Sequence, residues 1–106
     1  MAYYNRDGTK IGESLNEMTQ GDREKIIEIN NRKVKETTLK DGKWVSTVFL
    51  GIDHGFGEGK PLIFETMVFP KKGDYGDLYY ERYSTEEEAI KGHDKIVKKF
   101  NKKRLK

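Results

Sequence analysis

Four residues of this sequence belong to the types that bind metals or move protons near neutral pH: Asp53, His54, Glu65 and His93. Carboxylates and imidazoles can act as general acids, general bases or metal ligands. Their spacing matches no metal-binding signature, and the sequence has no nucleophile elbow. We therefore predict no metal, no cofactor and no catalysis. The alternative is a metal-assisted hydrolase that uses Asp53, His54 and His93.

A glycine-rich loop joins the two most apolar stretches, which cover residues 44–53 and 62–69. The loop lacks the Gly-Lys-Ser/Thr ending of a phosphate-binding P-loop and the helix that follows one. Asp53 and His54 have a structural interpretation, in which they order the loop by bonding to its own amides. For a ligand or partner, the candidate binding residues are Asp53, His54, Gly55, Phe56, Gly57, Gly59 and Lys60.

Tyrosines next to basic residues form a third group with possible function: Tyr75, Tyr79, Tyr80, Arg82 and Tyr83, beside Lys71 and Lys72. Such residues can stack on nucleic-acid bases or on a nucleotide. Packing in the core and at its rim is the favoured interpretation, because tyrosine is common in strands. Since no RNA-recognition or DNA-recognition motif is present, a protein is the preferred partner, with an anionic nucleotide as the alternative ligand.

The chain of 106 residues carries a formal net charge of +3, with 34% hydrophobic and 37% charged residues. This length fits a single domain over residues 1–106, with its core in residues 32–101, an N-terminal arm in 1–31 and a basic tail in 102–106. The absence of cysteine excludes disulfides and thiolate metal sites. No stretch approaches the about 20 apolar residues of a membrane span, so we expect no membrane and a cytoplasmic location.

Residues 34–39, 44–53, 62–69 and 78–83 are predicted strands, because they are rich in β-branched and aromatic residues between turn signals. Asp7-Gly8 predicts a small hairpin or a tied-down arm near the N-terminus, and a capping box from Ser14 to Glu17 predicts a short helix over 15–19. Residues 22–31 fit neither a helix nor a strand period cleanly, so they are predicted to form a short helix or an irregular lead-in to the first strand of the sheet.

The Asp41-Gly42 pair predicts a hairpin with a two-residue loop. This loop pairs Leu39 with Trp44, so Leu39 shares a sheet face with Trp44, Val48 and Leu50, and we expect that face to be the core.

The last element is a predicted helix over residues 85–101. Either Ser84 or Thr85 can cap it, and three glutamates follow at the positive end of the helix dipole. Its apolar stripe contains Ala89, His93, Ile96, Val97 and Phe100, whereas the lysines of the helix fall on the opposite side. The predicted fold is therefore α+β: a four-stranded antiparallel meander packed on one face by a C-terminal helix, with a short N-terminal hairpin or helix.

Glu65 interrupts an apolar strand, so its carboxylate needs water or a buried partner. If Val48 opposes Glu65 and Trp44 opposes Phe69, then Glu65 lies on the predicted helix-covered face. A contact between Glu65 and His93 would satisfy both groups and would be structural rather than catalytic. A slip of one residue would expose Glu65 instead.

The segment WVSTVFLGIDHGFGEGKPLIFETMVF, with the downstream RYSTEEEAIKGH, resembles a family of small proteins of unassigned function from bacteriophages and prophages. The resemblance covers residues 36–93. It implies a viral accessory role in the bacterial cytoplasm, and small phage proteins of this kind include inhibitors of host defence. The expected function is a non-enzymatic phage protein that binds and inhibits a host protein complex, such as a nuclease or another antiviral effector.

One further expectation concerns the sheet face that the helix leaves open. From the predicted register, this face carries Val45, Thr47 and Phe49, which is more apolar surface than a monomer usually exposes. It predicts a symmetric homodimer through that face.

Overall fold

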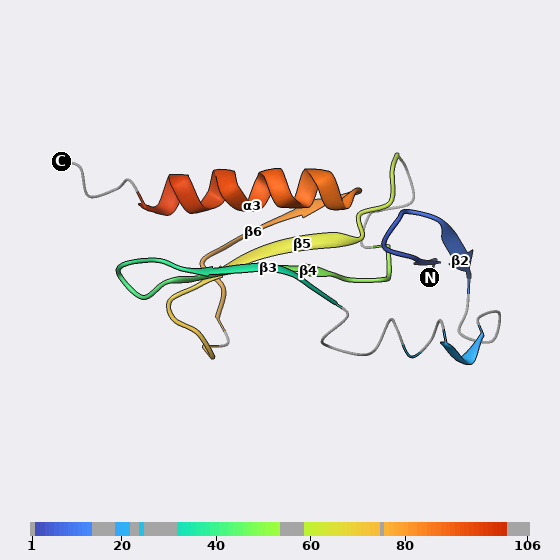
Figure 1. Cartoon of the computed structure of the whole chain (residues 1–106), viewed down its shortest axis with the longest axis horizontal. Coiled ribbons are helices and arrows are strands. Elements are labelled where there is room, and N and C mark those ends of the chain that lie inside the picture. The colour runs from blue at the N-terminus through green and yellow to red at the C-terminus, as the bar shows by residue number, and fades with distance from the viewer. Residues whose placement is uncertain are drawn as a thin grey trace.

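The computed structural model describes residues 2–13, 19–21, 24, 32–53, 59–74 and 76–101. The α+β prediction is confirmed: an antiparallel sheet in the order β3-β4-β5-β6 packs against helix α3, and a separate two-stranded hairpin precedes it (Figure 1). The elements are β1 (Tyr3–Tyr4), β2 (Lys10–Gly12), β3 (Lys33–Thr38), β4 (Trp44–Phe49), β5 (Phe64–Phe69), β6 (Tyr79–Tyr83) and α3 (Glu86–Asn101). The predictions for 14–18 and for nearly all of 22–31 lie outside the described residues.

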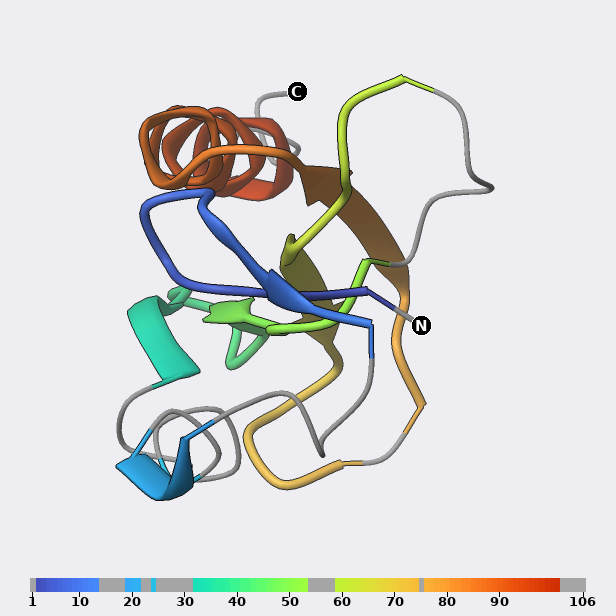
Figure 2. The ribbon, with the colours of Figure 1, turned by 90° about the vertical axis from the view of Figure 1, so that its right-hand side faces the viewer.

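The predicted N-terminal hairpin is present and is fixed to the rest of the fold at two points. Its turn contains Gly8 with φ of 93°, a conformation that suits glycine. Tyr3 forms a β-bridge with Ile52, three residues after the end of β4. In Figure 2 the blue N-terminal hairpin lies against the green chain that follows this strand. On the other side, the Arg6 guanidinium makes two hydrogen bonds of 3.1 and 2.9 Å to the Glu86 carboxylate at the start of α3. The hairpin therefore links the sheet to the helix.

The β3–β4 turn contains three residues between its closing pair, so the prediction of a two-residue loop is wrong. Leu39 N donates to Lys43 O at 2.8 Å, and Gly42 N donates to Leu39 O at 3.0 Å. Gly42 has φ of 99°, as expected for a type I turn followed by a left-handed glycine. The Asp41 carboxylate supports this geometry by accepting a 3.1 Å hydrogen bond from Lys43 N. The extra residue pairs Trp44 with Thr38 instead of Leu39.

The prediction of the core face is also wrong, as a direct result of that loop length. Opposed residues point to the same side of a sheet, so pairing Thr37 with Val45 places Leu39 on the side of Val45 and not on the side of Trp44. Buried residues of β4 are Val45, Thr47 and Phe49. These residues lie under α3, which removes the structural basis of the predicted homodimer.

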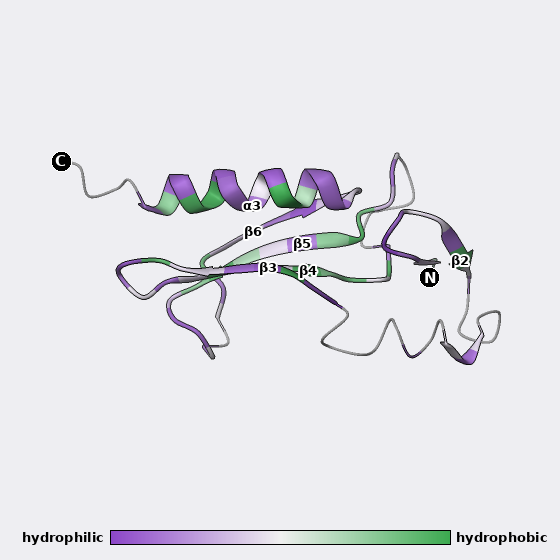
Figure 3. Cartoon of the chain, in the orientation of Figure 1, coloured by the Kyte–Doolittle hydropathy of each residue, from purple (hydrophilic) through white to green (hydrophobic). Residues whose placement is uncertain are grey.

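Helix α3 begins as the sequence predicts. Thr85 is the N-cap: its Oγ1 accepts a 3.1 Å hydrogen bond from Glu88 N, and Glu88 Oε1 accepts a 3.3 Å hydrogen bond from Thr85 N in return. This reciprocal pair satisfies two amides that a helix start leaves without partners. The buried side of the helix includes Ala89, His93 and Ile96, and its hydrophobic residues are turned toward the sheet (Figure 3).

The core between sheet and helix consists of two apolar clusters. One contains Leu39, Val45, Val68 and Ile96. The other contains Phe49, Ile63, Phe64 and Ala89. Between them in the strand register lies the pair of Thr47 with Thr66, and His93 lies between Ala89 and Ile96 along the helix. The core is thus divided by a polar layer.

Candidate functional site

His93 occupies the polar layer and is fully buried. Its Nε2 lies 2.9 Å from Thr37 Oγ1 on β3, and its Nδ1 lies 2.7 Å from Thr47 Oγ1 on β4. Thr47 Oγ1 in turn lies 2.5 Å from Thr66 Oγ1 on β5. One imidazole therefore connects the helix to three adjacent strands by a continuous hydrogen-bond network.

The network is complete when the imidazole is neutral. A neutral ring offers one donor and one acceptor, and a threonine hydroxyl can serve as either. Burial lowers the pKa of His93 below its ordinary value, the Lys35 ammonium lowers this pKa further, and Asp94 opposes the shift. Since the ring is shielded from solvent and satisfied at both nitrogens, its role is to hold α3 on the sheet.

Glu65 does not contact His93, so the predicted pair is wrong. The predicted register itself is confirmed, with Val48 opposite Glu65 and Trp44 opposite Phe69. However, this set of residues points away from α3, on the opposite side of the sheet from His93. Glu65 is 7% exposed and accepts a 2.9 Å hydrogen bond from Arg82 Nε on β6. The carboxylate in the apolar strand is therefore satisfied by an arginine of the neighbouring strand.

Asp53 has the loop-ordering role that the sequence suggested. Its Oδ1 accepts a 2.9 Å hydrogen bond from Leu62 N, which connects the two ends of the glycine-rich loop. At the end of the loop, Gly59 has φ of 78° and Lys60 is exposed. The other loop candidates, His54, Gly55, Phe56 and Gly57, lie outside the described residues.

The predicted tyrosine group is divided between the two faces of the sheet. Tyr79 and Tyr83 contact the buried clusters on the helix side. Tyr80 points to the other side, is 52% exposed and has the Arg82 guanidinium 5.0 Å from its ring centroid. Tyr75 lies outside the described residues. The described tyrosines thus form no single stacking platform.

Within the described ranges, no group of three or more acidic or histidine residues is arranged to hold a metal, and no helix has the length and hydropathy to cross a bilayer.

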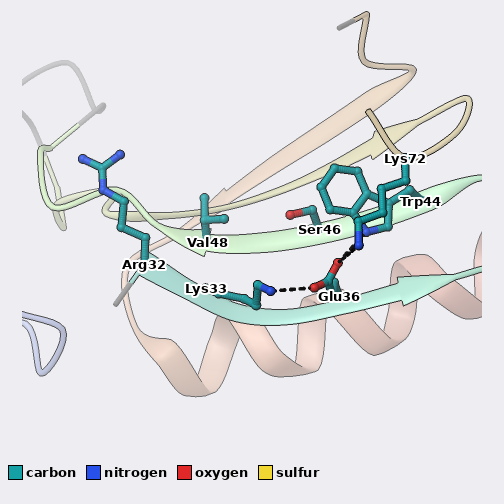
Figure 4. A pocket seen from close by; sticks show the side chains of 7 residues that line it. All are labelled: Arg32, Lys33, Glu36, Trp44, Ser46, Val48 and Lys72. Carbon is teal, nitrogen blue, oxygen red and sulfur yellow. Dashed lines mark hydrogen bonds and ion pairs between the residues drawn. The ribbon is translucent and has the colours of Figure 1, made fainter. Parts of the chain in front are cut away.

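A pocket of about 370 Å³ lies on the sheet face opposite to α3, and we define it as the Trp44 pocket (Figure 4). Strands β3 and β4 and the loop after β5 supply its walls. Figure 4 shows Arg32 at one end, Trp44 and Lys72 at the other end, and Val48 and Ser46 between them. The complete lining is Arg32, Lys33, Glu36, Trp44, Ser46, Val48 and Lys72.

Glu36 is the centre of the polar contacts in this pocket. Its carboxylate accepts a 2.8 Å hydrogen bond from the indole Nε1 of Trp44 and lies 2.7 Å from Lys33 Nζ. Lys72 Nζ is 3.6 Å away on the other oxygen. The hydrogen bonds from Lys33 and Trp44 lower the pKa of Glu36 to about 2. Glu36 is therefore ionised throughout the physiological pH range.

Trp44 is held in one orientation by contacts within the chain. Its ring stacks on Phe69 with centroids 5.4 Å apart, while Glu36 fixes the indole N–H. The Lys72 ammonium lies 5.7 Å from the indole centroid, within the range of a cation–π contact. An aromatic ring fixed in this way loses little conformational entropy on binding.

The sequence predictions missed this pocket because they placed Trp44 in the core. A three-residue Lys40-Asp41-Gly42 loop would have placed Trp44 on the correct face of the sheet. It pairs Glu36 with Ser46, so that Trp44 is a diagonal neighbour of Glu36.

Comparison of the chain with family models, with curated proteins and with solved structures gave no match.

Proposed function

We propose that this chain is a non-enzymatic binding protein, and that the sheet face opposite to α3 is its binding surface. The Trp44 pocket is the observation that carries the proposal. The indole is oriented by Glu36 at 2.8 Å and by Phe69 at 5.4 Å between ring centroids, although neither contact is needed to fill the core under α3.

The residue types on this face are those that contribute most to protein–protein binding. Tryptophan, tyrosine and arginine are enriched among residues whose truncation costs an interface more than about 2 kcal/mol. Here Trp44 lines the pocket, and Tyr80 with Arg82 forms a second aromatic and cationic pair on the same face. A protein partner is therefore the best match to the chemistry of the surface.

The biological role follows from the resemblance to small phage and prophage proteins. In this proposal the partner is a host protein complex in the bacterial cytoplasm, such as a nuclease or another antiviral effector, and binding inhibits it. Tight occupation of a functional surface is sufficient for inhibition, so this role requires no catalytic group.

The proposal is tested by affinity capture from host lysate with matched variants. Ser46→Glu places a carboxylate between the half-buried residues of the pocket, whereas the control Lys95→Glu makes a larger charge change of the same sign on an exposed position of α3. We expect wild type and Lys95→Glu to capture the same stoichiometric partner and Ser46→Glu to lose it, with unchanged circular dichroism. Capture of no partner, or equal capture by all three proteins, would contradict the proposal.

A further inference from the structure

The chemistry of the lining residues restricts the class of ligand that the Trp44 pocket can bind. Building on the proposed function, we infer that the pocket binds an extended acidic segment of the partner protein, in which an apolar residue is flanked by carboxylates. Charge, length and the nature of the pocket floor support this inference independently.

The pocket has more positive than negative charge. Two lysines, Lys33 and Lys72, line it against the single carboxylate of Glu36. Arg32 adds a third cation, which also donates a 3.4 Å hydrogen bond to the neutral Leu50 O. Glu36 lies within 4 Å of both Lys33 and Lys72, so one carboxylate is shared by two ammonium groups. Lys33 and Lys72 are also more than half exposed, so an incoming anion can reach them. A negatively charged ligand is therefore favoured by electrostatic complementarity.

The cations are spaced along the pocket. Arg32 is at one end and Lys72 at the other, on either side of the β4 segment from Trp44 to Val48 (Figure 4). Four residue steps of an extended strand cover about 13 Å. An extended peptide of similar length would place carboxylates at both ends and one or two side chains between them.

The floor between the cations is small and mostly apolar. Val48 and Ser46 leave room above β4, and the fixed indole forms a flat wall at one end. A leucine or valine side chain would bury apolar surface there, which favours binding. Because the pocket is short, a peptide alone should bind in the micromolar range or more weakly, with the rest of the partner adding affinity.

A peptide suits the pocket better than a nucleic-acid strand. A nucleic-acid strand carries a phosphate at every nucleotide and so would place negative charge beside the ionised Glu36 as well as beside the cations, whereas a peptide can keep its carboxylates at its two ends. The Glu36 carboxylate and the Ser46 hydroxyl can accept hydrogen bonds from the N–H groups of a peptide. A single-stranded oligonucleotide is accordingly the competing ligand to test.

Trp44 provides a direct signal for binding, because it is the only tryptophan of the chain. The probes are a seven-residue peptide with a Leu-Val-Leu centre flanked on each side by Asp-Glu, the same peptide with Asn-Gln flanks, and octathymidylate. Each is titrated into the full chain while tryptophan emission is recorded. We expect a saturable change with the acidic peptide, at least tenfold weaker binding of the amide peptide, and weaker binding at high salt.

Two charge variants locate the site. Lys72→Glu should weaken the acidic peptide at least tenfold, whereas Lys95→Glu on α3 should leave its affinity within twofold. Equal binding of the acidic and amide peptides, stronger binding of octathymidylate, or no saturable signal with the acidic peptide would each overturn the inference. If Ser46→Glu still abolishes capture of a host protein while the acidic peptide fails, then the inference is wrong and the proposed function stands.

Discussion

Substituting Gly92 by alanine should destabilise this protein, although alanine is the better helix former. Gly92 is buried on α3 against the ring of Tyr83 from β6. A Cβ atom added at Gly92 would lie 2.3 Å from the Tyr83 hydroxyl oxygen and 2.4 Å from two ring carbons. An ordinary contact begins near 3.4 Å, so the ring or the helix would have to move by about 1.1 Å.

Both the Tyr83 ring and helix α3 are restrained, and this sets the size of the expected loss of stability. Tyr83 packs against the cluster around Phe64 and its hydroxyl donates to Glu81 at 3.1 Å, while His93, next to Gly92, is held by two threonines. Overpacking of this kind costs about 1–3 kcal/mol. The gain in helix propensity returns about 1 kcal/mol. Because neither element can move freely, the overpacking cost should lie in the upper part of that range, at about 2–3 kcal/mol. The net loss should then be about 1–2 kcal/mol, or a fall in Tm of about 5–10 °C.

The assay is thermal and urea unfolding of four proteins: wild type, Gly92→Ala, Tyr83→Val and the double variant. Valine keeps the strand preference of position 83 and removes the atoms that clash. In that background Gly92→Ala should become stabilising by about 1 kcal/mol, because only the propensity term remains. A Gly92→Ala single variant that is more stable than wild type would refute the reasoning.

Three further predictions concern buried polar groups. Burial lowers the pKa of His93 below 6.5 in the folded state, so the unfolded chain binds more protons as the pH falls below about 6.5, and stability present at neutral pH is lost on acidification. In His93→Gln, the Tm measured from pH 7 to 5 should therefore depend less on pH than in wild type. An unchanged slope of Tm against pH would contradict this. Thr47→Val should cost about 1–3 kcal/mol by urea unfolding because it leaves His93 Nδ1 without its partner, and Thr47→Ser, which keeps the hydroxyl, should cost clearly less. Arg82→Gln should destabilise the fold more than Glu65→Gln does. The Glu65 side chain is 9% exposed and that of Arg82 is 30% exposed, so only the arginine can recover its hydration when its partner is removed. Equal losses of stability in denaturant titrations of the two variants would exclude this asymmetry.

The fold could be predicted from local signals that the structure uses directly. The reciprocal hydrogen bonds of Thr85 and Glu88 start α3 where the sequence places it, and the predicted opposition of Trp44 to Phe69 is present. These features depend on residues a few positions apart or on a continuous strand pattern. They fix which elements form and the register of β4 with β5.

The side of the sheet that α3 covers could not be predicted in this way. It depends on whether one residue more or less lies in the Asp41-Gly42 turn, because side chains alternate with a period of two. Both faces of β4 carry apolar residues, so hydropathy does not decide between Trp44 and Val45. Polar residues indicate which face α3 covers. A buried His93 needs hydroxyl partners, and the pair of Thr47 with Thr66 provides them on only one face of the sheet. The same error hid the Trp44 pocket and produced the Glu65–His93 pair.

The order of the strands has a consequence for how the chain folds. From β4 onward, each strand of the β3-β4-β5-β6 sheet pairs with the strand that precedes it, so the sheet can form by successive hairpins that join neighbours in the sequence. The helix that covers Val45, Phe64 and Val68 follows the last strand. During synthesis α3 cannot cover these residues until the chain has emerged through Asn101, so the interval before that point carries the greatest risk of aggregation.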